Sequence, residues 1–327
     1  MSAPAAVERR APGSSPARAA ACRRRVAQAL AAALVLALLA LVVVRGLSDR
    51  IFERRYGLPT AAAARETAAV FEVPIDARLL ERGRHLVTEV AQCTFCHGPD
   101  LAGRELADDP WIGRLHASNL TRGSGGVGAR LSDADWIAAL RRGVASDGRS
   151  LLLMPSAGLA RLGDRDLAAV VAYVRRVPSV DRVLPPRRVG WLTRLVVSAG
   201  LAPDLISAEQ AVRVEADREA IEPAPTDAYG KYLVSIGGCR ACHRADLGGG
   251  LHPLSLPGEP VPPDLTRRGG LAAWSLAEFA RAMREGRTPD GRRLDRAFMP
   301  WPAFSGLEEV EIEAIWRYLQ SVEAPSA

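Results

Sequence analysis

The motif Cys-x-x-Cys-His occurs twice in this chain, first as Cys93–His97 and again as Cys239–His243. The 327 residues contain five cysteines, so the two motifs hold all of them except Cys22. A histidine directly after a cysteine pair brings three groups with affinity for a metal or cofactor into one short stretch of backbone. The surrounding sequence therefore has to fold into two separate binding sites, one around each motif.

Three chemistries use such cysteine pairs. A structural zinc ion usually takes four ligands from one compact unit, whereas these pairs lie far apart and each is followed by histidine. A thioredoxin-like pair follows a strand in a βαβ pattern, whereas helical patterning surrounds both motifs. The third chemistry is covalent attachment of haem c, with two thioethers and a histidine facing the iron. The motifs predict two covalently bound haems, held by Cys93, Cys96 and His97 and by Cys239, Cys242 and His243.

An internal repeat of about 100 residues supports this interpretation. The segment Leu153–Val177 matches Phe298–Val322, so that Met154-Pro155 recurs as Met299-Pro300. A thioether ligand on haem iron raises its reduction potential. The repeat therefore predicts Met154 and Met299 as the sixth iron ligands, so the predicted metal ligands are His97, Met154, His243 and Met299.

Other assignments remain open for these side chains. Met154 and Met299 could instead pack in the core, which is the role expected for Met283. A histidine could replace either methionine and lower the potential of that haem. The candidates are His85, His116 and His252, for which surface or hydrogen-bonding roles are the default.

Apolar residues follow a helical period in both repeats. The last helix of each has the i, i+3, i+4, i+7 stripe, and Ser305-x-x-Glu308 is a plausible capping box before the second. No alternating run is long enough for a sheet, so the predicted fold is all-α. The two stripes comprise Leu167, Val170, Val171 and Val174, and Ile312, Ile315, Trp316 and Leu319.

The run from Val26 to Val44 contains one polar residue in 19, about 28 Å as a helix, which suits a bilayer core. No convincing small-x-small cleavage site follows, so an uncleaved anchor is favoured over a cleaved signal peptide, and over a buried soluble helix. Arg23–Arg25 would stay in the cytoplasm by the positive-inside rule. The prediction is a single-pass protein of the bacterial inner membrane with its haem domains in the periplasm.

The formal net charge of +6 is concentrated before residue 26, beside the apolar run. A nucleic-acid-binding protein would instead need a basic face on a folded domain, so that class is excluded. Between the repeats, Trp191–Leu201 is a candidate amphipathic helix. Packing against a neighbouring domain is favoured for it over lying on the membrane surface.

In these motifs the chain resembles the class I cytochrome c family. It is most similar to the membrane-bound cytochrome c subunits of periplasmic dehydrogenases. The resemblance rests on the two Cys-x-x-Cys-His motifs, Asn119–Thr121 and Asp264–Thr266, the two Asp-Gly-Arg turns, the Met-Pro pairs, and Tyr173 and Tyr318. It implies a helical bundle around each haem, in which Gly83 and Gly230 pack against those tyrosines.

Two departures from the family pattern stand out. The dehydrogenase subunits commonly carry three haems, and this chain has motifs for two. In the family, a proline carbonyl often accepts the N–H of the iron-binding histidine. Pro263 fits that role, but the first repeat has Ser118 there, so another carbonyl is expected to serve the first haem.

The predicted order is an N-terminal transmembrane helix followed by two tandem cytochrome c-like helical domains. The predicted function is electron transfer by a membrane-anchored dihaem cytochrome that is not itself an enzyme. Its partners would be a dehydrogenase, an oxidase or a soluble cytochrome. The alternative is a dihaem peroxidase-like or gas-binding protein with one open iron. The predicted boundaries are a basic tail over 1–25, an anchor over 26–46, a tether over 47–75, haem domains over 76–180 and 226–327, and a linker over 181–225.

Overall fold

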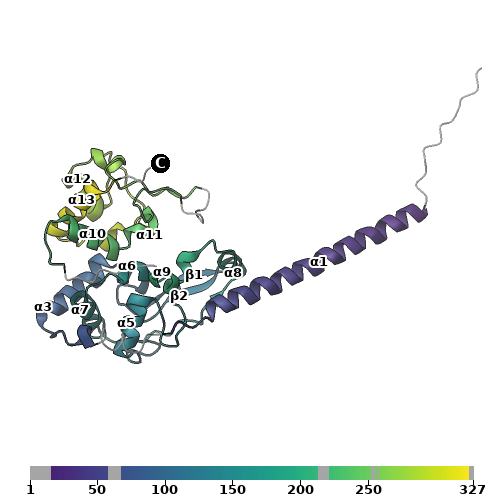
Figure 1. Cartoon of the computed structure of the whole chain (residues 1–327), viewed down its shortest axis with the longest axis horizontal. Helices are drawn as coiled ribbons and strands as arrows, with labels where there is room; N and C mark the ends of the chain where they lie inside the picture. The colour runs from purple at the N-terminus through teal and green to yellow at the C-terminus, as the bar shows by residue number, and fades with distance from the viewer. Residues whose placement is uncertain (1–15, 58–67, 213–220, 252–254, 256–257, 324–327) are drawn as a thin grey trace, which may run out of the picture. The chain divides into compact units, whose positions relative to one another are not determined.

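The structure, a computed structural model, describes residues 16–57, 68–212, 221–251, 255 and 258–323 (Figure 1). It divides into two compact units, one up to Asp49 and one from Arg50 onward. Of the features considered above, the following lie outside the described residues: His252, the first fifteen residues of the basic tail, 58–67 of the tether, 213–220 of the linker and 324–327 at the end of the second haem domain.

The first unit is dominated by helix α1 (Pro16–Phe52), which is 37 residues long. Its segment Arg23–Phe52 is long and apolar enough to cross a membrane, and it contains an 18-residue stretch with a mean hydropathy of 2.7 in which no residue is buried. The apolar helix predicted from Val26–Val44 is therefore present. The large apolar side chains between Val26 and Val43 are exposed.

In the second unit, the first repeat is built from short helices. Helix α3 crosses α7, and Gly83 makes the crossing possible. A Cβ atom at Gly83 would overlap the carbonyl oxygen of Ala169 and lie 2.9 Å from Tyr173 Cβ. The elements are α3 (Ala77–His85), the π-helix η1 (Leu86–Val90), α4 (Cys93–His97), α5 (Asp133–Arg142), α6 (Ser156–Leu159) and α7 (Asp164–Val174).

The second repeat forms the same crossing, between α10 and α13. A Cβ atom at Gly230 would overlap the carbonyl oxygen of Ala314 and lie 2.7 Å from Tyr318 Cβ. The glycine-to-tyrosine packing expected from the resemblance is thus found twice. The elements are α10 (Asp227–Ile236), α11 (Cys239–His243), η3 (Gly270–Ala273), α12 (Leu276–Glu285), η4 (Trp301–Phe304) and α13 (Glu309–Ser321).

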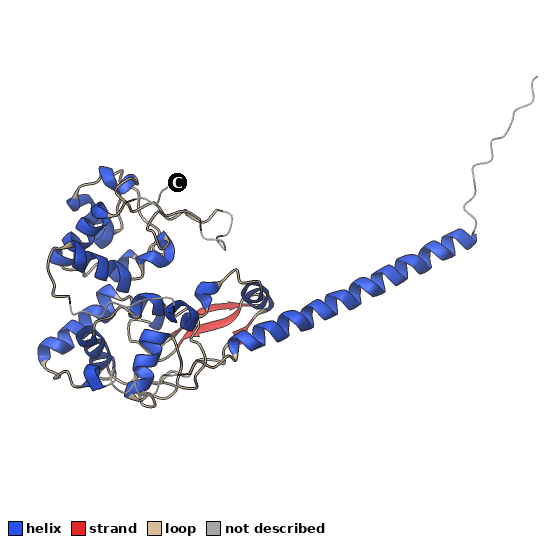
Figure 2. Ribbon diagram, in the orientation of Figure 1, coloured by secondary structure: helices blue, strands red, loops and turns tan. Residues whose placement is uncertain are grey.

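The fold is mostly helical but not all-α, which corrects the sequence-based prediction. Strands β1 (Arg104–Asp109), β2 (Gly113–Ala117) and β3 (Arg188–Val189) form an antiparallel sheet in the order β1-β2-β3 (Figure 2). Periodicity did not reveal it because a short hairpin is stabilised mainly by backbone pairing and its turn. Asp109 forms that turn, since its carboxylate accepts the backbone N–H groups of Trp111 and Ile112, both at 2.8 Å.

Three further helices connect the repeats: α8 (Trp191–Ser198), η2 (Pro203–Leu205) and α9 (Ser207–Val212). The expected amphipathic helix is α8. Its Val197 is buried in a cluster with Phe52, Ala202 and Ile206, so the predicted packing role is confirmed for this face of α8.

The main hydrophobic cluster draws buried side chains from both repeats, including Leu86 and Val90 from η1 and Leu233 and Ile236 from α10. The predicted stripes lie within it, with Trp316 partly buried at its edge, and Met283 is buried there too. The predicted capping box at Ser305 is wrong. Glu308 and Glu311 cap α13, whereas Ser305 donates its hydroxyl hydrogen to the Pro302 carbonyl.

Candidate functional site: two matched cysteine–histidine helices

Each Cys-x-x-Cys-His motif forms a helix of its own, α4 in the first repeat and α11 in the second. Both helices begin directly after a residue in the left-handed region, Gln92 at φ 54° and Gly238 at φ 72°. The chain therefore turns sharply before each motif and then winds for about one helical turn, which brings both cysteines and the histidine close together.

The histidines of both motifs are held in the same way. His97 Nδ1 lies 2.8 Å from the carbonyl oxygen of Ser118, and His243 Nδ1 lies 2.9 Å from that of Pro263. A carbonyl oxygen only accepts hydrogen bonds, so each Nδ1 carries the hydrogen. Each Nε2 is left with a free lone pair, the form in which imidazole binds a metal.

The Ser118 contact corrects the expectation that another carbonyl would serve the first histidine. The segments after the two histidines follow the same path, because Leu101 and Leu247 both have positive φ values, 54° and 62°. Their carbonyls each accept an N–H, from Leu120 and Leu265 respectively, at 2.8 Å. The backbone path fixes the position of the accepting carbonyl, so a proline is not required there.

Burial sets the protonation of the motif side chains. It lowers the pKa of His97 and of His243, partly offset by the hydrogen bonds to Ser118 and Pro263, so both imidazoles are neutral at pH 7. Burial raises the pKa of Cys93 to about 12 and that of Cys239 to about 11. Redox-active cysteine pairs have lowered pKa values, so a thioredoxin-like role does not fit these thiols.

The two predicted methionine ligands also occupy matched conformations. Met154 and Met299 are partly buried against the main hydrophobic cluster. The prolines that follow have nearly identical backbone angles, φ −77° and ψ 55° at Pro155 and φ −77° and ψ 52° at Pro300. In both loops the methionine carbonyl accepts the N–H two residues later at 2.7 Å, from Ser156 and from Trp301.

These side chains fit a covalently bound haem. Each repeat offers two thiols for thioether bonds, a neutral imidazole and a thioether sulfur, the donor set of a c-type haem. The first repeat also contains a buried donor, Trp136 Nε1, for which the described residues supply no hydrogen-bond acceptor. An acidic group of a cofactor would satisfy it. By contrast, the described residues contain no group of three or more His, Cys, Asp or Glu side chains suited to a metal ion.

The histidines considered as alternative ligands are placed as follows. His85 is buried, and its Nε2 lies 2.7 Å from Glu311 Oε2 on α13. His116 lies on β2, and burial lowers its pKa. Because His85 is engaged by a carboxylate of the other repeat, it serves the contact between the repeats.

That contact contains polar residues that the sequence did not point to. Arg82 forms two hydrogen bonds with Asp166 on α7, at 2.9 and 3.0 Å, and one with Glu311 at 3.4 Å. The hydroxyls of Tyr229 and Tyr232 on α10 donate to Glu311 and to Asp166, at 3.2 and 2.7 Å. A signal was present: Glu311 lies one helical turn before Ile315, on the apolar stripe of α13, where an unpaired carboxylate would be costly.

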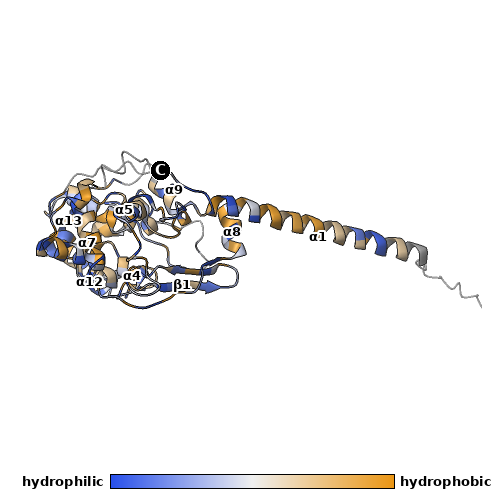
Figure 3. Ribbon diagram, turned by 90° about the horizontal axis from the view of Figure 1, so that it is seen from below, coloured by the Kyte–Doolittle hydropathy of each residue, from blue (hydrophilic) through white to orange (hydrophobic). Residues whose placement is uncertain are grey.

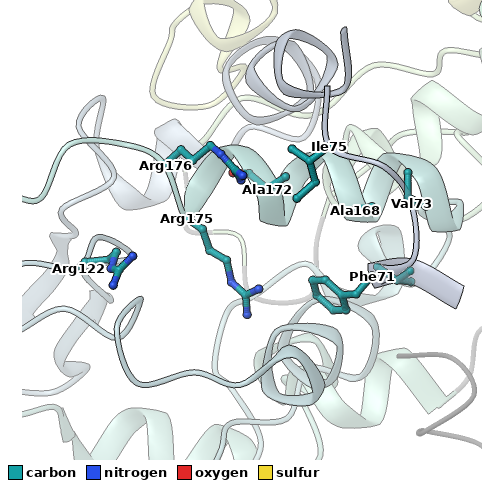
Figure 4. A pocket seen from close by; sticks show the side chains of 9 residues that line it. Phe71, Val73, Ile75, Arg122, Ala168, Ala172, Arg175 and Arg176 are labelled. Carbon is teal, nitrogen blue, oxygen red and sulfur yellow. The ribbon is translucent and has the colours of Figure 1, made fainter. Parts of the chain in front are cut away.

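A pocket of about 400 Å³ lies apart from both motifs (Figure 4). Its walls are apolar residues of the segment before α3 and one face of α7, and Arg122 and Arg175 point into it. Arg175 lies 5.2 Å from the ring centre of Phe71 and pairs with Asp133 at 2.6 Å. None of the predicted haem ligands lines this pocket.

Known proteins share this sequence pattern. Residues 78–174 match the family described as cytochrome c oxidase, cbb3-type, subunit III. The gluconate 2-dehydrogenase cytochrome c subunit of Pantoea cypripedii is 29% identical over 301 residues, covering 80% of this chain and 63% of the relative. The alcohol dehydrogenase (quinone) cytochrome c subunit of Komagataeibacter europaeus is 35% identical over 106 residues, 30% of this chain and 22% of the relative. The fructose dehydrogenase cytochrome subunit of Gluconobacter japonicus is 30% identical over 122 residues, 32% of this chain and 25% of the relative.

Residues 78–174 therefore form a domain of the cytochrome c family, which implies covalently bound haem c and electron transport. Within that family, the chain is similar to proteins named as cytochrome c subunits of dehydrogenases. It spans 63% of the length of the gluconate dehydrogenase subunit and smaller shares of the other two.

Proposed function

We propose that this protein is a membrane-anchored dihaem cytochrome that passes electrons from a dehydrogenase to the next redox partner. The observation that carries the proposal is the repetition of one geometry. In both repeats a histidine follows two cysteines on a short helix, and its Nδ1–H is bound by a backbone carbonyl 20 or 21 residues later. The same arrangement supports the same cofactor in each repeat, in haem domains over 76–180 and 226–327.

The roles of the side chains follow from this arrangement. Cys93 and Cys96 attach one haem and Cys239 and Cys242 the other, which keeps both cofactors bound outside the cytoplasm. His97 and Met154 would hold one iron, and His243 and Met299 would hold the other, with each imidazole offering its Nε2. Bound haem iron supplies a one-electron Fe(III)/Fe(II) couple. The backbone carbonyls of Ser118 and Pro263 orient the imidazoles and increase their basicity.

Helix α1 supplies the membrane anchor in this proposal. Its length and composition suit a bilayer span, and the arginines of its N-terminal part favour the cytoplasmic side. The haem-bearing unit then lies in the periplasm. An anchor confines the protein to a thin layer and raises its effective concentration near other membrane-bound redox proteins.

The relatives suggest the electron donor. Three of them are named as cytochrome subunits of gluconate, alcohol and fructose dehydrogenases, so we infer a dehydrogenase partner for this chain as well. Purification of the full-length protein from its native membrane, with identification of the subunits that accompany it, tests this inference. Recovery of the holoprotein without any dehydrogenase subunit would contradict it.

The haem count is tested by intact mass. The exported wild-type protein should carry two haems, and the variants Cys93→Ala/Cys96→Ala and Cys239→Ala/Cys242→Ala should each carry one. Cys22→Ala is the matched control and should retain both. A wild-type protein with one haem, or a double variant that keeps two, would overturn the dihaem assignment. A colourless exported protein would overturn the proposal as a whole.

A further inference from the structure

Five large apolar side chains are exposed on two adjoining segments of the second unit, and together they are here named the tryptophan surface. Two come from the turn between β1 and β2, and three come from α8. The exposed fractions are 67% for Trp111, 40% for Ile112, 40% for Trp191, 47% for Leu192 and 52% for Leu195. Exposed apolar groups of this size gathered in one place mark an interaction site.

The two parts of this surface are fastened together. The carbonyl of Trp111 accepts the N–H of Leu192 at 3.0 Å, and the carbonyl of Ile112 accepts the N–H of Gly190 at 2.8 Å. The hydroxyl of Thr193 donates to the same Ile112 carbonyl at 2.8 Å. These hydrogen bonds hold the hairpin turn against the start of α8, so the two segments that bear the five side chains keep a fixed arrangement.

Helix α8 is apolar on two opposite faces. Trp191, Leu192 and Leu195 fall on one side of the helix, since residues three and four apart share a face, whereas Val197 faces the buried cluster. Figure 3 shows the apolar residues of α8 in orange. A helix that is apolar on both sides needs a second apolar environment besides the protein core.

The position of α8 in the chain indicates what that environment is. The buried face of α8 packs on Phe52, the last residue of the helix that is suited to span a membrane. Arg194 on α8 lies 5.9 Å from the ring centre of Phe52. Helix α8, which holds three residues of the tryptophan surface, therefore packs against the C-terminal end of α1.

The chemistry of the surface and its edge suits the headgroup region of a bilayer. Tryptophan is enriched at that depth because its ring is apolar and its N–H is polar. Arg188 on β3 is exposed beside this surface, whereas the charge of Arg114 is balanced by Asp108 at 2.9 Å and by Glu105 at 3.9 Å. An exposed basic residue beside apolar ones favours binding to anionic lipids.

We propose that the tryptophan surface is a second membrane contact, which lies in the headgroup region while α1 crosses the bilayer. The proposal rests on the membrane anchor of the proposed function. Such a contact would fix the orientation of the haem-bearing unit on the bilayer instead of leaving it to rotate about the end of α1. The occupant is lipid, and a protein partner on this surface is the competing outcome of the test.

The test uses the full-length holoprotein in nanodiscs of phosphatidylethanolamine and phosphatidylglycerol that contain a phospholipid with a photoreactive diazirine in its headgroup. After illumination, mass spectrometry locates the lipid adducts. We expect adducts on α1, on residues 111–112 and on residues 191–195. The double variant Trp111→Ser/Leu195→Ser should lose the adducts on the tryptophan surface and keep those on α1. Leu276→Ser, at an exposed apolar residue of α12, should leave the adduct pattern unchanged.

The outcomes separate the two proposals. Adducts on α1 alone would overturn the membrane contact and leave the anchor intact. Adducts on neither would overturn the anchor itself, whereas the haem content would be unaffected. If the surface gains no lipid adducts but contacts a purified dehydrogenase when that protein is added, the surface is a protein interface and the lipid proposal is wrong. Haem stoichiometry by intact mass checks that the variants fold, and the wild-type adduct map stands without them.

Discussion

The two repeats bind their motif histidines alike but differ around them. Gly83 precedes Cys93 by ten residues, whereas Gly230 precedes Cys239 by nine. The additional residue is absorbed by the π-helical turn Leu86–Val90, which follows α3 in the first repeat, whereas α10 runs as an α-helix up to Gly237. A π-helical turn accommodates one extra residue without ending the helix, so the motif helix keeps its place despite the different length.

The contact between the repeats exchanges equivalent positions. His85 and Tyr232 both lie two residues after the crossing glycine, and each reaches a carboxylate on the last helix of the other repeat. His85 contacts Glu311, and Tyr232 donates to Asp166. The two carboxylates occupy matched positions, because Glu311 and Asp166 lie four residues after the buried leucines Leu307 and Leu162. The repeats therefore meet through matched positions occupied by different chemistry, and the following predictions test how far the match extends.

The largest expected effect comes from removing the predicted thioether ligands. Met154→Ala and Met299→Ala should each lower the potential of one haem by on the order of 0.1 V, within the roughly 0.8 V range that axial ligands span. Redox titration followed by absorbance measures this, and Met283→Leu is the buried control that should leave both potentials in place. Unchanged potentials and spectra in both ligand variants would show that these methionines do not bind iron, which reopens the alternative of an open iron site.

The next effect concerns the contact between the repeats. Glu311→Gln removes a carboxylate that is 1% exposed and paired with both His85 and Arg82. Breaking a buried ion pair from one side costs about 3–5 kcal/mol, so chemical unfolding should show a loss of this size. Glu313→Gln on the same helix breaks an exposed pair with Arg317, worth about 1 kcal/mol or less. Equal losses in the two variants would contradict a structural role for the contact.

The sequence predicted most of the local geometry of the site but not its surroundings. The motifs, the Met-Pro loops and the glycines at the helix crossings repeat within the chain, and each imposes a short-range constraint that can be recognised without a structure. The sheet and the Arg82–Asp166–Glu311 network depend on pairing between residues that are distant in sequence. Periodicity carries no information on such pairing. The carbonyl of Ser118 shows a further limit, since its position depends on the backbone path and not on the identity of the side chain.

A smaller effect is expected at the two helix crossings, where the repeats match most closely. Gly83→Ala and Gly230→Ala would each place a methyl group against a carbonyl oxygen of the facing helix. Overpacking of this kind costs about 1–3 kcal/mol, and the two losses should be similar. Gly270→Ala, where a Cβ atom meets nothing within 4 Å, is the control for thermal unfolding. A loss in one repeat only would mean that the crossings are not equivalent.

The smallest effect is a pH dependence of the free energy of unfolding. Of the two pairs between the repeats, only His85–Glu311 can produce it, and Tyr232–Asp166 cannot. Burial opposes the charge of His85, but the hydrogen bond and charge of Glu311 outweigh it and raise its pKa above the usual value. Burial also opposes the charge of Glu311 and by itself would raise the pKa of this carboxyl. That effect is outweighed by the hydrogen bond to His85, the charges of His85 and Arg82 and the Glu308 backbone N–H, so the pKa of Glu311 is lowered. On the other side, burial and Asp166 raise the pKa of Tyr232 far above neutral, so it does not titrate near pH 7.

The sign of this dependence follows from the two shifts. A raised pKa in the folded state means that the contribution of His85 is complete below its unfolded pKa of about 6.5, and is lost as pH rises through the folded value. The lowered pKa of Glu311 gives a contribution that is lost as pH falls through its folded value. The free energy of unfolding should therefore decrease as pH rises above about 6.5, by about 1.4 kcal/mol for each unit by which the pKa of His85 is raised. His85→Gln keeps a hydrogen-bond donor to Glu311 but cannot titrate, so urea unfolding of this variant should lose that slope, whereas Tyr232→Phe should retain it. If His85→Gln keeps the full slope, another group titrates and the asymmetry between the repeats lies elsewhere.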